Sequence, residues 1–129
     1  MPHLTIEYSK NLRDAIGPDA MVDALHTAAV ATGEFPAMSL RTRAVERECY
    51  RVGDGHPDNG FVHIVLRIRP GRERARKTEI GEAVFAAALA HLKPTFDTRP
   101  LGLTFEVQEI DIAFRFLKNN MVEHWAARK

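Results

Sequence analysis

The residue whose chemistry stands out in this chain is its second, Pro2. Removal of Met1 would leave the Pro2 nitrogen as a free secondary amine, which can act as a base or nucleophile without a cofactor. An ordinary α-amino group has a pKa of about 7.7–8.0, and burial or nearby cations lower it toward the value that a base at cellular pH needs. The alternative is that Pro2 is simply a small residue that follows the initiator methionine. If Met1 is retained, the Pro2 nitrogen is an amide and cannot act as a base.

Three arginines have the type and spacing to bind a carboxylated substrate beside such an amine. Arg41 and Arg43 lie two residues apart on an expected strand, so their side chains share a face. Arg72 follows Gly71 at an expected helix start, where free N–H groups and the helix dipole attract anions. A guanidinium group matches a carboxylate geometrically. The alternative is that these arginines are solvated or paired with acids elsewhere in the sequence: Glu46, Glu48, Asp58 and Glu73.

Other polar clusters favour less specific interpretations. The basic run 67–77 suggests a nucleic-acid surface, but it lacks interleaved aromatic residues, so a solvated helix face is the preferred interpretation. Four potential metal ligands, Asp54, His56, Asp58 and His63, lack a recognised ligand spacing, and no metal site is predicted. Cys49 has no evident catalytic partner and is expected to be structural.

The positions of the apolar residues and of the helix- and strand-breaking residues predict a strand–helix–strand order that occurs twice. Leu4, Ile6 and Tyr8 alternate with polar residues, as in a half-buried strand. The later elements follow from the same patterns and from glycine and proline breaks. The predicted elements are a helix from about 18 to 32, a strand over 39–49, turns over 53–60, a strand over 61–69, a helix over 72–92 that Pro94 closes, and a strand over 101–107.

The two units, about 2–57 and 58–110, predict an α+β fold in a single domain, 1–129. Each connection is long enough to make the two strands of its unit parallel, with a right-handed crossover. Side by side, the units would give a four-stranded mixed sheet with two helices on one face. The open face, with Thr5, His63, Val65 and Thr104, is expected to be too apolar for bulk water, which favours oligomerisation through it. Segment 111–129 is also apolar and is expected to pack on a neighbouring chain.

Composition is that of an ordinary globular protein of 129 residues, with 45% hydrophobic and 27% charged residues. The net charge of +1 gives no global field toward nucleic acid or a membrane. One cysteine excludes an internal disulfide and fits a reducing compartment. The sequence has no apolar run of the roughly 20 residues that a membrane helix needs and no signal-peptide layout, so a cytoplasmic location is expected.

Several short motifs, taken together, resemble the 5-carboxymethyl-2-hydroxymuconate isomerase family of the tautomerase superfamily. Each motif is weak alone, but their order and spacing extend from Pro2 to about Asn120. They are residues 2–3 (Pro-His), 31–36 (Ala-Thr-Gly-Glu-Phe-Pro), 41–43 (Arg-Thr-Arg), 61–63 (Phe-Val-His), 70–72 (Pro-Gly-Arg), 103–106 (Leu-Thr-Phe-Glu) and 119–120 (Asn-Asn).

The resemblance implies a cofactor-free isomerase of homoprotocatechuate degradation that converts a small carboxylated dienol into its conjugated ketone. It implies a homotrimer with a barrel-like core of three sheets, and neither a nucleic-acid nor a membrane partner. The family's terminal proline corresponds to Pro2, the general base after Met1 removal, and its catalytic, substrate-binding arginines to Arg41 and Arg72. Arg43 matches a second arginine of the same strand motif and is a further candidate for substrate binding.

The chain also departs from the family pattern. Glu73 stands where similar members have a small hydroxyl residue, so it would weaken the anion site or pair with Arg72. Residues 121–129 match no pattern of the family. The alternatives are another tautomerase-superfamily activity, dehalogenation or decarboxylation of a small unsaturated acid, and a non-catalytic oligomeric binding protein of the same fold.

Overall fold

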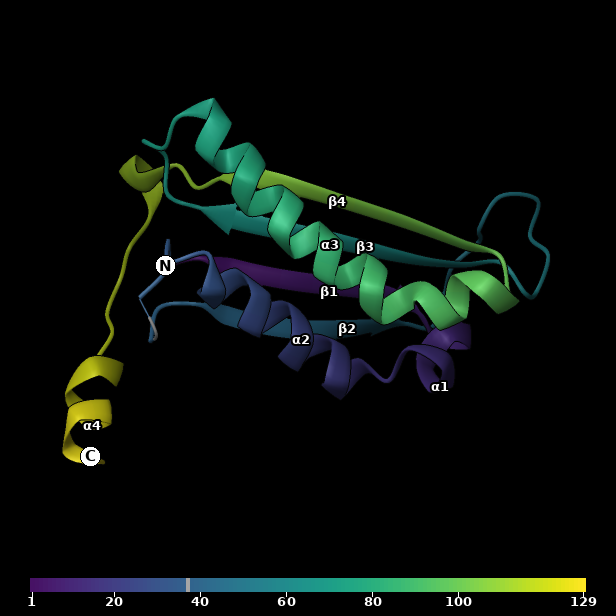
Figure 1. Cartoon of the computed structure of the whole chain (residues 1–129), viewed down its shortest axis with the longest axis horizontal. Helices are drawn as coiled ribbons and strands as arrows, with labels where there is room; N and C mark the ends of the chain where they lie inside the picture. Colours follow the sequence, from purple (N-terminus) through teal and green to yellow (C-terminus); the bar gives the residue numbers. More distant parts are fainter. Residues whose placement is uncertain (37) are drawn as a thin grey trace.

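The chain folds into two strand–helix–strand units and a C-terminal tail, as a computed structural model of residues 1–36 and 38–129 shows (Figure 1). Both units have the predicted order, which confirms the pattern-based assignment. The first contains β1 (His3–Ser9), the short helices η1 (Lys10–Leu12) and α1 (Arg13–Ile16), α2 (Pro18–Ala31) and β2 (Arg41–Arg47). The second contains β3 (Gly60–Ile68), α3 (Arg74–Thr98) and β4 (Leu101–Glu109), and the tail contains η2 (Ile112–Phe114) and α4 (Met121–Ala127).

The sheet has four strands in the order β2-β1-β3-β4. Strands β1 and β2 are parallel, and so are β3 and β4, as expected from the two crossover connections. The units meet through the antiparallel pair β1 and β3, which makes the sheet mixed. Helices α2 and α3 lie across one face of the sheet (Figure 1).

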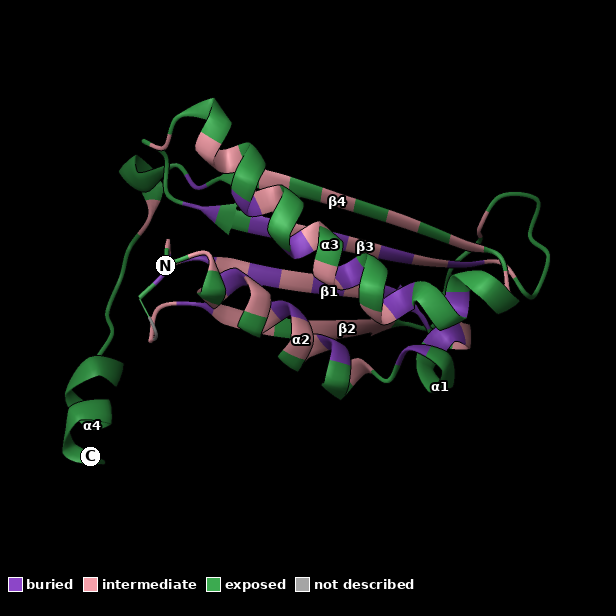
Figure 2. Cartoon of the chain, in the orientation of Figure 1, coloured by how far each residue is buried: buried purple, intermediate pink, exposed green. Residues whose placement is uncertain are grey.

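The core consists mainly of buried residues of β1, β3, α2 and α3, drawn in purple in Figure 2. Leu4 and Ile6 of β1 are fully buried and lie opposite Leu66 and Ile64 of β3, because alternate residues of a strand share a face. Helix α2 contributes residues spaced by four, and α3 does the same along a longer line. These buried helix residues are Met21, Leu25 and Ala29 of α2, and Ile80, Val84, Ala88 and Leu92 of α3.

The open face of the sheet is polar, so the expectation of an apolar face is wrong. Glu7 accepts a hydrogen bond from Arg47 Nε (2.6 Å), and its other carboxylate oxygen lies 3.6 Å from His63 Nδ1. His63 Nε2 lies 3.1 Å from Glu106 on the neighbouring strand. The strand register places these charged side chains next to one another on the open face. The expectation considered Thr5, His63, Val65 and Thr104 and did not include the charged residues beside them.

Helix α3 extends past Pro94, which was predicted to close it. Proline removes one N–H donor from the helix ladder, yet Pro94 itself is exposed and Leu92 and Thr95 around it are buried. The Arg99 N–H donates to the Thr95 carbonyl at 3.0 Å, so hydrogen bonding continues beyond the proline. Packing of the last turn therefore outweighs the local penalty.

The tail after β4 is largely exposed (Figure 2). Phe114 is 79% exposed and Phe116 is 93% exposed. The tail nevertheless returns to the start of the chain, since Arg41 Nη2 lies 3.3 Å from Met121 Sδ and Asn119 Nδ2 lies 3.6 Å from Met1 Sδ. Packing of this segment on a neighbouring chain stays a prediction. None of the described helices is long and apolar enough to cross a membrane.

Candidate active site

A pocket of about 320 Å³ lies at one end of the sheet. Its size is within the range of about 300–1,000 Å³ that is usual for small-molecule sites. Strands β1 and β2 both begin at this end of the sheet, because His3 lies opposite Arg41. Strand β3 runs the other way and ends there with β4, because His3 also lies opposite Arg67 and Ile68 lies opposite Glu109. The topology therefore brings four separate segments together: the chain start, the α2–β2 connection, the β3–α3 connection and the tail.

Pro2 lines this pocket and is buried. Its carbonyl accepts a hydrogen bond from the Arg41 backbone N–H at 3.2 Å, which fixes the start of β1 against β2. With Met1 attached, the Pro2 nitrogen is an amide and the free amine belongs to Met1. Burial lowers the pKa of that amine, and Arg115, Arg69 and Arg41 lower it further. The chain start thus lies in a positive field.

Arg72 lines the same pocket, but it is already engaged by an acid. Its Nε donates to Glu34 Oε2 at 2.8 Å, its Nη2 donates to the Glu34 carbonyl at 3.2 Å, and its guanidinium lies over the Phe35 ring. Glu34 also accepts from Arg76, and these two hydrogen bonds lower the pKa of the Glu34 carboxyl. Neither Glu73 nor any other acid named from the sequence is this partner.

Arg41 does not line the pocket, but its side chain borders it. Arg41 Nη1 donates to the Ser39 carbonyl at 2.9 Å and lies 3.4 Å from Met1 Sδ. A thioether sulfur is a weak acceptor, so the contacts of this guanidinium with Met1 and Met121 leave it able to bind an anion.

Arg43 is exposed and lies one step further along the open face. Its Nη1 donates to His3 Nδ1 at 3.1 Å. Burial lowers the pKa of His3, and Arg43 and Arg41 lower it further, which keeps the ring neutral. Arg43 is not among the residues that line the pocket, so the structure places it beside His3 and apart from Pro2.

Two pocket arginines were not singled out from the sequence. Arg69 was noted only as part of the basic run, and it follows the last residue of β3. Arg115 lies in the tail, 113 positions after Pro2, and no local pattern connects it with the start of the chain. Both arginines line the same pocket because β3 and β4 finish at the end of the sheet where β1 begins.

The remaining polar candidates have other surroundings. The basic run is partly neutralised, because Arg76 binds Glu34 and Glu79 and Lys77 binds Glu109. Within residues 1–36 and 38–129, no cluster of three or more His, Cys, Asp or Glu side chains could hold a metal ion. Cys49 is exposed just beyond β2, and its expected structural role stays a prediction.

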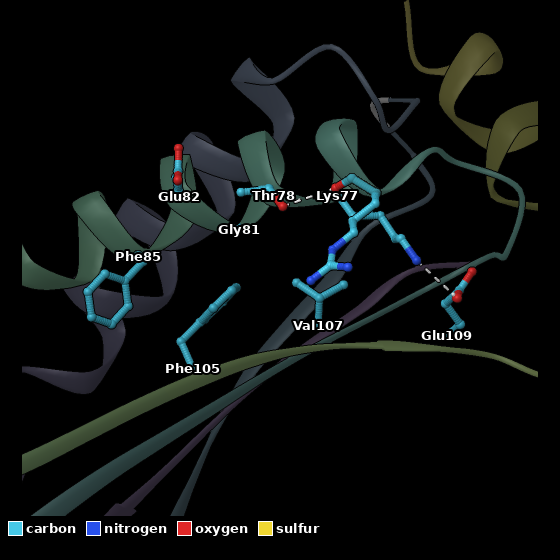
Figure 3. A pocket seen from close by; sticks show the side chains of 9 residues that line it. Lys77, Thr78, Gly81, Glu82, Phe85, Phe105, Val107 and Glu109 are labelled. Atoms are coloured by element: carbon cyan, nitrogen blue, oxygen red, sulfur yellow. Dashed lines mark hydrogen bonds and ion pairs between the residues drawn. The ribbon is translucent and has the colours of Figure 1, made fainter.

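A second cavity, of about 460 Å³, lies between α3 and the edge strand β4 (Figure 3). Phe85 and Phe105 meet there edge to face, and Lys77 binds Glu109 at 3.2 Å. Neither Pro2 nor any pocket arginine lines this cavity. The pocket at Pro2 is therefore the candidate active site, because a potential amine base and several cations meet there.

Known proteins with the same sequence and structure features point to one family. The family model described as "5-carboxymethyl-2-hydroxymuconate isomerase" matches residues 2–125. An Escherichia coli 5-carboxymethyl-2-hydroxymuconate Delta-isomerase is 30% identical over 121 residues, covering 94% of this chain and 96% of that protein.

Solved structures agree with the sequence comparison. A 5-carboxymethyl-2-hydroxymuconate isomerase from Deinococcus radiodurans R1 has a TM-score of 0.87 and 34% identity over 96% of this chain and 93% of its own. Another solved structure, a 5-carboxymethyl-2-hydroxymuconate delta-isomerase, has a TM-score of 0.90 and 29% identity over 97% and 93%. A fused 4-OT symmetric trimer, at 16% identity and a TM-score of 0.65 over 90% and 93%, shares the fold only.

Proposed function

Since this chain belongs to the 5-carboxymethyl-2-hydroxymuconate isomerase family, we propose that the pocket at Pro2 is where it binds and isomerises that dienol. The protein is an isomerase that acts on 5-carboxymethyl-2-hydroxymuconate, a reaction that moves a proton and shifts double bonds. The observation that carries the site assignment is the meeting of Pro2 with Arg72, Arg69 and Arg115 in one pocket. Dehalogenation and decarboxylation would use the same Pro2, and the family match favours isomerisation over both.

The proposed reaction begins after removal of Met1, with the Pro2 nitrogen as a neutral base. This nitrogen takes the proton from the 2-hydroxyl group, and the electron pair of that O–H bond forms the C2=O bond. The two carbon–carbon double bonds give way to one between C3 and C4, and C5 receives a proton from the prolinium ion. Atoms and charge balance without an oxidant, a metal or another cofactor.

The arginines have two tasks in this proposal. Arg41 and Arg72 hold carboxylates of the substrate and stabilise negative charge that develops on the dienolate oxygen. Glu34 leaves Arg72 Nη1 with only a long contact to the Arg69 carbonyl, at 3.4 Å, so that this nitrogen still has a donor for the substrate. Arg43 bonds to His3 and supports substrate binding indirectly.

We also propose that the working protein is a homotrimer. The fused 4-OT of the same fold is described as a symmetric trimer, and the exposed apolar tail of this chain offers surface to a neighbour. The polar open face would then be joined through ion pairs and hydrogen bonds across chains, and not through apolar burial alone. In this arrangement three sheets would form the barrel-like core.

The substitution Pro2→Ala tests the proposed base. It replaces the secondary amine, which the proline ring holds in place, with a primary amine that no ring holds. We therefore expect kcat/KM to fall on the order of 10²-fold or more, while the fold is kept. Intact-mass measurement should show that both the wild-type protein and the variant lack Met1. Circular dichroism of both proteins provides the control for folding.

Two outcomes would contradict this role of Pro2. One is full activity of a Pro2→Ala protein that lacks Met1. The other is an active wild-type preparation whose every chain retains Met1, because an amide nitrogen cannot accept the proton.

A further inference from the structure

Arg115 has the surroundings of a group that awaits an anionic partner. Its Nε is buried, and among the described residues it has no hydrogen-bond partner. No side-chain hydrogen bond or ion pair connects Arg115 with any other described residue, yet its side chain lines the pocket of Pro2. Arg72 in the same pocket has the opposite character, because Glu34 already occupies two of its nitrogens. A buried guanidinium donor without a partner is costly unless a ligand satisfies it.

The substrate has one carboxylate more than the two arginines of the proposed mechanism can hold. Muconate has a carboxylate at each end, and the carboxymethyl branch adds a third on C5. C5 is also the carbon that receives the proton. A cation that holds this branch would therefore fix C5 near the Pro2 nitrogen, which is what transfer of the proton requires.

We propose that Arg115 binds the carboxylate of the carboxymethyl branch and thereby determines specificity for the branched triacid over the unbranched 2-hydroxymuconate. This assignment rests on the proposed function of the Pro2 pocket. The guanidinium plane offers two parallel donors to a carboxylate, and the buried Nε is one of them.

Arg69 is the competing cation for the branch, and the structure favours Arg115. Arg69 is exposed to solvent, so it loses little when unpaired, whereas Arg115 is half-buried. Arg115 also lowers the pKa of the Met1 amine more than Arg69 does, which fits a position close to the start of the chain. Leu117 lines the pocket beside it, so the tail supplies both a charge and an apolar wall.

The experiment compares two substrates on the full-length mature protein. Steady-state kinetics are measured with 5-carboxymethyl-2-hydroxymuconate and with 2-hydroxymuconate for the wild type, Arg115→Ala and Arg115→Lys. At about pH 9, where the amine is mostly neutral in every variant, Arg115→Ala should lower kcat/KM for the branched acid on the order of 10- to 100-fold and change that for 2-hydroxymuconate less than about threefold. Arg115→Lys keeps the charge but loses the planar pair of donors, so its effect should be intermediate.

Lys118→Ala is the matched control, because Lys118 is an exposed cation of the same tail and does not line the pocket. It should leave both substrates unaffected. If Arg115→Ala does not fold, the Arg115→Lys protein decides by the same ratio of the two substrates.

The possible results separate this assignment from the proposed function. Equal losses on both substrates, or no loss on either, would overturn the role of Arg115 while leaving the Pro2 mechanism intact. A wild-type protein that turns over neither acid would overturn the proposed function and this assignment with it.

Discussion

The pKa of the amine at the chain start depends on burial and on the charges around it. Burial, Arg115, Arg69 and Arg41 all lower the pKa of the amine at the chain start. Removal of Met1 moves this amine one residue inward, to a position that is buried in the folded chain. Both effects disfavour the protonated form, so the amine is neutral over a wider range of pH than an ordinary α-amine. A neutral amine is the form that the proposed mechanism requires of Pro2.

Substitution of Arg69 should change the pH dependence of catalysis. Activity falls as the pH drops through the pKa of the amine, since the protonated amine is no longer a base. Arg69→Ala removes a cation that lowers this pKa, so the pKa should rise and the acidic limb of kcat/KM should move to higher pH. Measurement of kcat/KM from about pH 5 to 9 gives the position of this limb, which can be compared with the pKa of about 7.7–8.0 of an ordinary α-amino group.

Arg74→Ala provides the control for this shift. Arg74 is exposed and lines the other cavity, so its removal should leave the limb in place. An acidic limb of Arg69→Ala that stays at the wild-type position, or moves to lower pH, would show that Arg69 does not act on the amine.

At the scale of elements, Glu34 connects the two units of the fold. It lies between α2 and β2, and it receives hydrogen bonds from Arg72 before α3 and from Arg76 within it. Arg76 also donates to the Thr32 carbonyl at 2.8 Å. One carboxylate thus joins the connection of the first unit to the helix start of the second and holds Arg72 at the pocket wall.

Glu34→Gln should destabilise the protein at pH 7, and the loss should disappear in acid. The folded-state pKa of Glu34 lies below its unfolded value, so its stabilising effect is complete above the unfolded value. This effect is lost as the pH falls through the lower, folded-state pKa. Thermal melting of wild type and variant from about pH 7 to 3 should therefore give Tm values that converge at low pH.

Glu79→Gln is the comparison for Glu34. Glu79 also binds Arg76, but its side chain is 62% exposed, so solvent screens the pair and the loss should be smaller. A Glu34→Gln protein whose Tm deficit is the same at pH 7 and pH 3 would contradict an ionic role for this carboxylate.

At the scale of the whole molecule, the tail after β4 is the segment that packs least against the rest of its own chain. Its apolar side chains are exposed, and α4 lies at the far end of the tail, away from the sheet (Figure 1). The same tail supplies Arg115 and Leu117 to the pocket. If neighbouring chains hold the tail in the proposed trimer, assembly and substrate binding are coupled through it.

The double substitution Phe114→Ser, Phe116→Ser should weaken the trimer without unfolding the chain. Both rings are mostly exposed in the single chain, so their loss removes little of its own core. Light scattering coupled to gel filtration should show three chains for the wild type and a shift toward one chain for the variant. Circular dichroism should remain unchanged.

Leu89→Ser, also an exposed apolar residue but on the outer side of α3, is the control and should remain trimeric. A double variant that keeps three chains at every concentration would exclude the tail from the assembly interface.

The sequence by itself determined the order of the elements and singled out Pro2 as the candidate base. Alternation in 3–8 and helical spacing in about 18–32 and 72–92 depend on local steric and apolar periodicity, so the two units, the parallel pairs and the position of Pro2 at the start of a strand were predictable. The run of motifs from Pro2 to about Asn120 also pointed to the family that the comparisons show.

Only the tertiary structure decided which charged side chains lie around Pro2 and which of them are paired with an opposite charge. Glu34 and Arg72 are 38 residues apart, and Arg115 is further still from Pro2, so their meeting depends on the antiparallel join of β1 and β3. Pro94 likewise remained helical because of burial around it, which local propensity does not contain. Contacts between distant segments are set by how the units pack, and periodicity along a single segment carries no information about that packing.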